Sequence, residues 1–104
     1  LLGAPASYWL DLASYDAFAQ AKALRKPILL LQGADDYQVT MNEDFLRWQL
    51  QMKSVEQFTT RSFSGLSHLF MPAGDPPGPN DYQTAGHVDA GVINELALWI
   101  RSVN

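Results

Sequence analysis

The sequence predicts an α/β fold in which two parallel strands are flanked by helices, in the order helix, strand, helix, strand, helix. Two segments rich in aliphatic, aromatic or β-branched residues, 28–32 and 55–63, alternate with three segments of helical character. The first of these two is apolar on both faces, which is typical of a strand inside a parallel sheet. Because strand–helix–strand units cross over in one hand, we expect the two strands to run parallel.

Length and composition limit the kinds of protein this chain can be. Its 104 residues predict a single domain, 1–104, with one core of modest size. Hydrophobic residues make up 47% and charged residues 17%, which excludes a largely disordered chain. The net charge of −4 argues against a nucleic-acid partner, because phosphate binding needs clustered cations. We expect no membrane span, since no run of about 18 apolar residues occurs.

Two further features leave questions open. The chain has no cysteine, which excludes disulfides and thiolate chemistry but does not fix a cellular location. It begins at Leu1 rather than at methionine, so we interpret it as part of a longer product or a trimmed chain.

The first helix is expected over residues 14–25, after an irregular lead-in over 1–13. Phe18 and Leu24 fall on one helical face, and the cations near the end suit the helix dipole. Pro27 then ends the helix, because the residue before a proline disfavours the helical conformation.

The second helix is expected to begin at Thr40, which forms a capping-box pair with Glu43. Apolar residues then recur at spacings of four, three and four, which predicts an amphipathic helix of about three turns. These residues are Met41, Phe45, Trp48 and Met52.

The second strand, 55–63, is expected to lead into a turn at 65–68. Residues 72–81 hold four of the six prolines, so they predict a surface loop without regular structure. The last helix is expected from about Asp89 to Ser102. Its apolar residues at helical spacing are Val92, Leu96, Trp99 and Val103.

Two residues in this arrangement can carry chemistry together, Asp36 and His68. Each lies in a short loop directly after a predicted parallel strand, so both side chains should emerge at the same edge of the sheet. An aspartate there can hold the imidazole in one tautomer, and the histidine can then act as a general base toward a nucleophile. On spacing alone, a plainer interpretation stays open, in which Asp36 caps a turn and His68 ends a strand.

Two motifs surround this pair. Residues 29–39, LLLQGADDYQV, are an apolar strand followed by G-x-x-D-x-x-V, and residues 65–68, GLSH, are G-x-x-H. In this order they resemble the acid loop and the histidine loop of the α/β-hydrolase family. The stretch 81–100 also looks like the C-terminus of bacterial esterase-type members. The resemblance covers roughly residues 8–103 and implies a partial α/β-hydrolase fold.

By position, the resemblance implies that Asp36 is the acid and His68 the base of a catalytic triad. Asp35 is the rival for the acid, but the residue count from the glycine of the motif favours Asp36. Tyr37 and Phe70 each adjoin one of these two residues. We therefore expect them to line a substrate pocket, with plain solvent exposure as the equal alternative.

The family's nucleophile is absent from this chain. Its motif, G-x-S-x-G, should precede these loops by roughly a hundred residues, and none of the seven serines stands in that setting. We therefore expect the C-terminal portion of a serine hydrolase of esterase type, acting on a carboxylic ester or related acyl substrate. Alone it should be inactive, because it lacks the nucleophile and the oxyanion donors. The alternative is a non-catalytic α/β binding or assembly module derived from the same fold.

Two buried parallel strands make a poor independent sheet, and a strand that is apolar on both faces needs neighbours. We expect the sheet to be completed by a missing N-terminal part or by a second copy, in a homodimer with a continuous intermolecular sheet. We expect no cofactor and no metal. A cluster of His87, Asp89, Asp81 and Asp75 has irregular spacing, and Asp89 more simply caps the last helix.

Overall fold

A two-stranded parallel sheet forms the centre of the computed structural model, which describes residues 5–7 and 15–103. Strand β1 (Ile28–Gly33) pairs with strand β2 (Phe58–Phe63) along its whole length, with Ile28 opposite Phe58. The predicted parallel pairing is therefore present. Apart from residues 5–7, the predicted lead-in lies outside the described residues.

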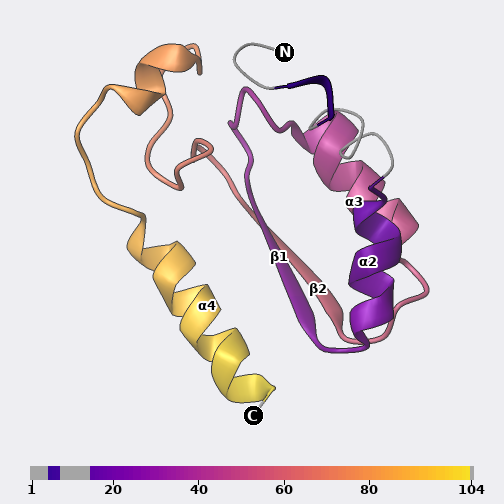
Figure 1. Ribbon diagram of the computed structural model, residues 1–104. Helices are drawn as coiled ribbons and strands as arrows, with labels where there is room; N and C mark the ends of the chain where they lie inside the picture. The colour runs from indigo at the N-terminus through magenta and orange to yellow at the C-terminus, as the bar shows by residue number, and fades with distance from the viewer. Residues whose placement is uncertain (1–4, 8–14, 104) are drawn as a thin grey trace.

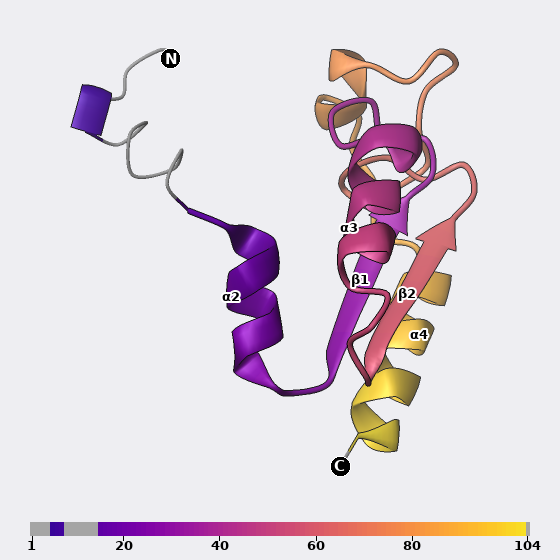
Figure 2. The same cartoon turned by 90° about the vertical axis from the view of Figure 1, so that its right-hand side faces the viewer.

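Helices cover both faces of this sheet. Helix α3 (Leu46–Gln51) lies on one face and helix α4 (Ala90–Ser102) on the other, as Figures 1 and 2 show. Helix α2 (Ala17–Leu24) packs beside α3, where Phe18 meets Trp48 edge to face with ring centroids 4.6 Å apart. The element order is the one that the sequence predicts, and together these features make a partial α/β fold.

Helix α2 is shorter than the predicted 14–25 because local bonds define its ends. The Asp16 carboxylate accepts the N–H of Ala19 at 3.1 Å and caps the first turn. Arg25 ends the helix in a left-handed conformation with φ of 52°.

The second helix begins with a π-helical turn, η1 (Met41–Phe45), that runs directly into α3. Thr40 Oγ1 accepts the N–H of Glu43 at 3.2 Å, as the predicted capping box requires. The return bond differs, because the Thr40 N–H donates to Asp44 Oδ2 at 2.7 Å. The role predicted for the Glu43 carboxylate is therefore wrong, since the wider first turn brings the next carboxylate back to the cap.

Two other boundaries differ from the predictions. Strand β2 begins at Phe58 rather than at residue 55, because Gln57 turns the chain with φ of 61°. The expectation of no regular structure in 72–81 is wrong in part, since the short 3₁₀ helix η2 (Pro79–Tyr82) forms there.

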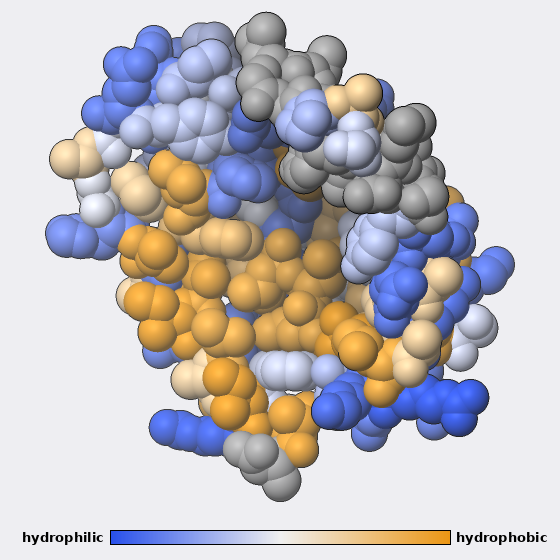
Figure 3. Space-filling model, viewed as in Figure 1, coloured by the Kyte–Doolittle hydropathy of each residue, from blue (hydrophilic) through white to orange (hydrophobic). Residues whose placement is uncertain are grey.

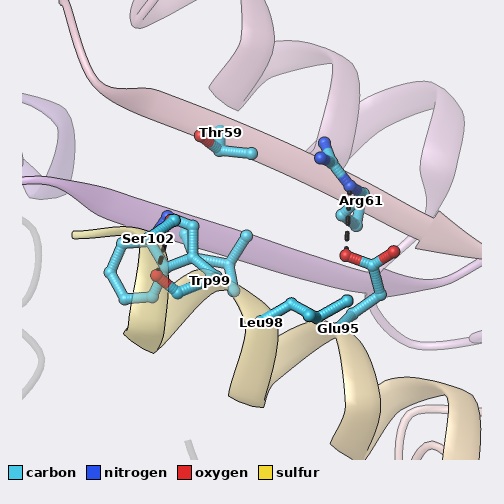
Figure 4. A pocket seen from close by; sticks show the side chains of 7 residues that line it. Thr59, Arg61, Glu95, Leu98, Trp99 and Ser102 are labelled. Atoms are coloured by element: carbon cyan, nitrogen blue, oxygen red, sulfur yellow. Dashed lines mark hydrogen bonds and ion pairs between the residues drawn. The ribbon is translucent and has the colours of Figure 1, made fainter. Parts of the chain in front are cut away.

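Helix α4 is seated loosely on the sheet. Asp89 caps it as predicted, accepting the N–H of Gly91 at 2.8 Å, and Val92 is buried. Glu95 pairs with Arg61 of β2 at 3.4 Å, with both side chains partly exposed. Figure 4 shows this ion pair beside a hollow of about 350 Å³ that remains between α4 and the sheet.

The residues of β1 are less buried than a central strand requires. From Ile28 to Leu31 they are only half-buried, because in the described part of the chain β1 has β2 as its single neighbour. Figure 3 shows hydrophobic side chains gathered across the middle of the molecule between α4 and α3. Among the described helices, none is long and apolar enough to cross a membrane.

Candidate active site

The loop that follows β1 holds Asp36 in a fixed orientation. Its Oδ1 accepts the backbone N–H of Gln38 at 2.9 Å and that of Val39 at 3.0 Å. Such a side-chain-to-backbone turn is what an aspartate forms readily in a loop. Asp36 is 7% exposed, so its carboxylate is enclosed by the loop that it organises.

A second side chain closes this loop from within. The amide of Gln32 donates to the carbonyl oxygen of Val39 at 2.6 Å and to that of Gly33 at 3.0 Å. Gln32 is 5% exposed, so its amide is enclosed; the bond to Gly33 is buried and the bond to Val39 is partly buried. Gln32 was not predicted as a site residue, although a single polar residue in an otherwise apolar strand is a usable signal.

The loop that follows β2 carries His68 at its tip. The N–H of Ser67 donates to the carbonyl oxygen of Met71 at 2.8 Å, and that of Ala73 to Gly65 at 2.9 Å. These two bonds make a tight turn that directs the histidine toward the neighbouring loop.

The two loops run against each other at the carboxyl end of the sheet. The Asp35 N–H donates to the carbonyl oxygen of Leu66 at 3.0 Å. Gly33 makes this approach possible, since a Cβ there would lie 2.2 Å from the Ser67 carbonyl oxygen. The glycine of the first motif is therefore required by close backbone packing.

The structure brings Asp36 and His68 into direct contact. Nδ1 of His68 lies 2.6 Å from Oδ2 of Asp36. The carboxylate side chain is 4% exposed and the imidazole 45%, so the acid is enclosed while the ring faces solvent. Asp35 is exposed, so of the two adjacent carboxylates Asp36 is the enclosed one that reaches the imidazole.

The other two predicted site residues have different neighbours. Phe70 contributes to a hollow of about 150 Å³ that also touches Asp36, His68 and Trp48. Tyr37 packs against another tyrosine of the chain, with ring centroids 5.7 Å apart. Whether either residue contacts a substrate stays a prediction.

The serine next to the histidine does not offer a nucleophile. Ser67 is 2% exposed, and its Oγ accepts the N–H of Leu69 at 3.2 Å. In the part of the chain that the structure describes, no three carboxylate or imidazole groups are gathered as metal ligands. Of the described residues, Asp36 and His68 are therefore the pair that the geometry brings together.

Comparison with known proteins gives one match to a curated protein. The chain is 38% identical over 100 residues to Esterase EstD of Thermotoga maritima. The match covers 96% of this chain and 24% of that esterase, so the chain spans about a quarter of the length of the curated relative it matches. Neither a family model nor a solved structure matches the chain. Over nearly its whole length, the chain is therefore related to one part of an esterase.

Proposed function

We propose that this chain supplies the acid and the base of a serine-esterase triad, Asp36 and His68, whose nucleophilic serine lies outside these 104 residues. The observation that carries the proposal is the 2.6 Å contact between Nδ1 and Oδ2, made where two parallel strands end. Similarity to an esterase over 96% of the chain supports the same function. The fold that this function implies is the C-terminal part of an α/β-hydrolase.

The geometry of the pair suits acyl transfer to a serine. Nδ1–H of His68 donates to Asp36, which leaves the lone pair of Nε2 to accept the proton of the serine hydroxyl. The serine oxygen then attacks the ester carbonyl, and the imidazolium is stabilised by the enclosed carboxylate. Nε2–H returns the proton to the leaving alcohol, and an acyl-enzyme forms. Water takes the place of the alcohol in the second half, which releases the carboxylic acid and free serine.

The isolated chain is expected to show no ester turnover. An acid–base pair without an activated hydroxyl and oxyanion donors lacks most of the stabilisation of the transition state. The substrate class that fits the pair is a carboxylic ester or a related acyl compound, processed by the complete enzyme.

The test protein is Esterase EstD in which this chain replaces the matching 100 residues. The chimera is expected to hydrolyse ethyl butyrate. His68→Gln and Asp36→Asn should each lower kcat by about 10³-fold or more, as loss of a triad member does in serine proteases. The measurement is kcat and KM for each purified variant.

Asp35→Asn is the matched control, because it makes the same change one residue away at an exposed position. Its kcat should stay within about twofold of the parent. A chimera that keeps full activity with His68→Gln contradicts the proposal. A folded chimera without activity favours the non-catalytic binding or assembly module, an alternative that the absence of G-x-S-x-G from this chain also favours.

We also propose that the edge of β1 that has no strand neighbour among the described residues is covered by a second copy when the chain is on its own, in a homodimer with a continuous sheet. Ile93, Leu96 and Ile100 of α4 are 55%, 41% and 46% exposed. At 100° per residue they share one side of the helix, turned away from the side where Glu95 meets β2. Light scattering at micromolar concentration tests the association, and a monodisperse monomer contradicts it.

A further inference from the structure

The proline-rich segment after the histidine loop, residues 72–82, is held closed by one carboxylate. We call this segment the strap. Asp81 is 6% exposed and accepts the N–H of Gly74 at 2.7 Å and that of Gly78 at 3.2 Å. These bonds turn the strap back on itself, and η2 then ends at Tyr82. The mechanism proposed above uses no residue of the strap.

The strap sets Tyr82 beside the acid–base pair. The hydroxyl of Tyr82 donates to the side-chain oxygen of Gln38. The backbone N–H of Gln38 in turn donates to the Asp36 carboxylate. The ring of Tyr82 lies 5.7 Å from that of Tyr37, and 6.4 Å from the imidazole of His68 at an interplanar angle of 85°. Tyr37 and Tyr82 thus form an aromatic wall beside the imidazole.

The Tyr82 phenol stays protonated at ordinary pH. Burial raises the pKa of the Tyr82 phenol, and nearby Tyr37, Asp36 and Asp81 raise it further. The hydroxyl therefore keeps its proton and continues to donate to Gln38. With the hydroxyl engaged there, the side of the ring toward the imidazole offers apolar surface.

The position of the wall decides which half of an ester it can touch. In acyl transfer the imidazole returns its proton to the leaving alcohol, so the alcohol oxygen lies at the free nitrogen of His68. The group carried by that oxygen then extends beside the imidazole, whereas the acyl chain extends from the carbonyl carbon. A wall that adjoins the imidazole therefore meets the alcohol part.

We propose that Tyr82 is a specificity-determining residue that selects esters by their alcohol part and favours alcohols with a planar aromatic group, such as benzyl alcohol. This inference rests on the proposed ester hydrolysis. Aromatic rings favour edge-to-face and offset contacts with one another beyond simple area burial, which gives an aryl group an advantage over an alkyl group of similar length.

The kinetic test compares benzyl acetate with n-butyl acetate in the chimera described above. Both esters release primary alcohols, so the comparison reports contacts more than leaving-group chemistry. Tyr82→Ala is expected to lower kcat/KM for benzyl acetate by about tenfold and for butyl acetate by about twofold at most. The ratio of methyl hexanoate to methyl acetate should not change, because the acyl chain lies elsewhere.

Two variants separate specificity from general damage. Tyr82→Phe keeps the ring and should retain the preference for benzyl acetate. Tyr15→Ala removes a tyrosine that is 60% exposed in another part of the molecule and should change neither ester. An equal loss for both acetates in Tyr82→Ala overturns the proposal, since a structural role predicts that result.

A binding experiment on the unaltered chain separates this proposal from the ester hydrolysis itself. Benzyl alcohol is titrated into the chain while the imidazole proton signals of His68 are followed by NMR. A saturable shift is expected in the parent, in Tyr82→Phe and in Tyr15→Ala, and its loss in Tyr82→Ala. The proposed role of Tyr82 is contradicted if the shift survives in Tyr82→Ala or is absent from the parent. A chimera that hydrolyses no ester contradicts the proposed function. The titration still tests whether Tyr82 binds an aromatic alcohol beside His68.

Discussion

The carboxyl end of the sheet and the α4 side of the molecule are built in opposite ways. At the carboxyl end, the buried polar residues form hydrogen bonds within the chain, and among the described residues no buried side-chain nitrogen or oxygen lacks a partner. These residues are Gln32, Asp36, Ser67 and Asp81. On the α4 side, large apolar side chains are exposed and a hollow of about 350 Å³ remains.

This contrast indicates which part of the molecule is stabilised by contacts within this chain alone. A loop that buries polar groups must satisfy them locally, because an unpaired buried group costs about 1–3 kcal/mol. The acid and histidine loops meet that requirement with bonds from this chain alone. The apolar faces have no such local solution, since their stability comes from area removed from water by a further layer or strand.

The largest effect on stability is expected from Gly33→Ala, which changes the contact between the two loops at the carboxyl end of the sheet. The new Cβ would lie 2.2 Å from the Ser67 carbonyl oxygen and 2.6 Å from that of Leu66. Both are backbone atoms, so the two loops must move apart. We expect a loss of about 3 kcal/mol or more in the free energy of unfolding, measured by urea denaturation.

Gly78→Ala is the matched control for this substitution. No atom lies within 4 Å of a Cβ built there, and its φ of 179° is ordinary extended backbone. The free energy of unfolding should change by less than about 0.5 kcal/mol. If the two alanine variants were equally stable, the close approach of the loops would not be a structural requirement.

A smaller loss is expected from Gln32→Met, which keeps the shape of the side chain but removes its two hydrogen bonds. The carbonyl oxygens of Val39 and Gly33 would lose buried donors, at a cost of about 1–3 kcal/mol. Gln49→Met is the control, because Gln49 is exposed and its side-chain amide donates to the Thr60 hydroxyl at 3.3 Å at the surface. Thermal unfolding gives the Tm of both variants. Similar shifts in Tm would mean that the buried amide contributes no more to stability than the exposed one.

The opposite region is tested by Ile93→Glu on α4. A charge in the proposed contact between copies should weaken self-association by about tenfold, since burying it is unfavourable. Leu98→Glu is the control, because Leu98 is 60% exposed but lies on the other side of the helix, in the wall of the hollow. Sedimentation equilibrium gives both dissociation constants, and equal weakening by the two variants would place the contact elsewhere.

The features of the fold that are predictable from the sequence also differ between the two regions. The parallel strands, the buried positions of Phe45 and Met52 and the contact of Asp36 with His68 were predictable. They follow from the hydrophobic period and from the rule that parallel strands end at one edge of the sheet. The catalytic role of the pair is a prediction that the geometry alone does not test.

What the sequence does not predict depends on which hydrogen-bond partners the folded backbone brings together. The bond from the Thr40 N–H to the Asp44 carboxylate depends on a π-helical turn that has no sequence signal in this chain. The position of Tyr82 depends on how Asp81 folds the strap, which proline and glycine content alone describes only as a loop. Such arrangements are decided by which buried groups find partners, and that is a property of the folded chain.

The smallest expected effect is on the pH dependence of the free energy of unfolding, and it comes from Tyr82 in the strap. Because burial raises the pKa of Tyr82 in the folded chain above 10.0, the unfolded chain releases this proton first as pH rises. The contribution of the neutral phenol is therefore fully present below pH of about 10 and is lost as pH rises through the higher folded pKa. Tyr82→Phe removes this titration, so the stability difference between parent and variant should be constant from about pH 8 to 10 and should then shift against the parent. Urea denaturation across that range measures the difference, and a difference that stays constant up to about pH 11 would mean that the phenol is as free in the folded chain as in the unfolded one.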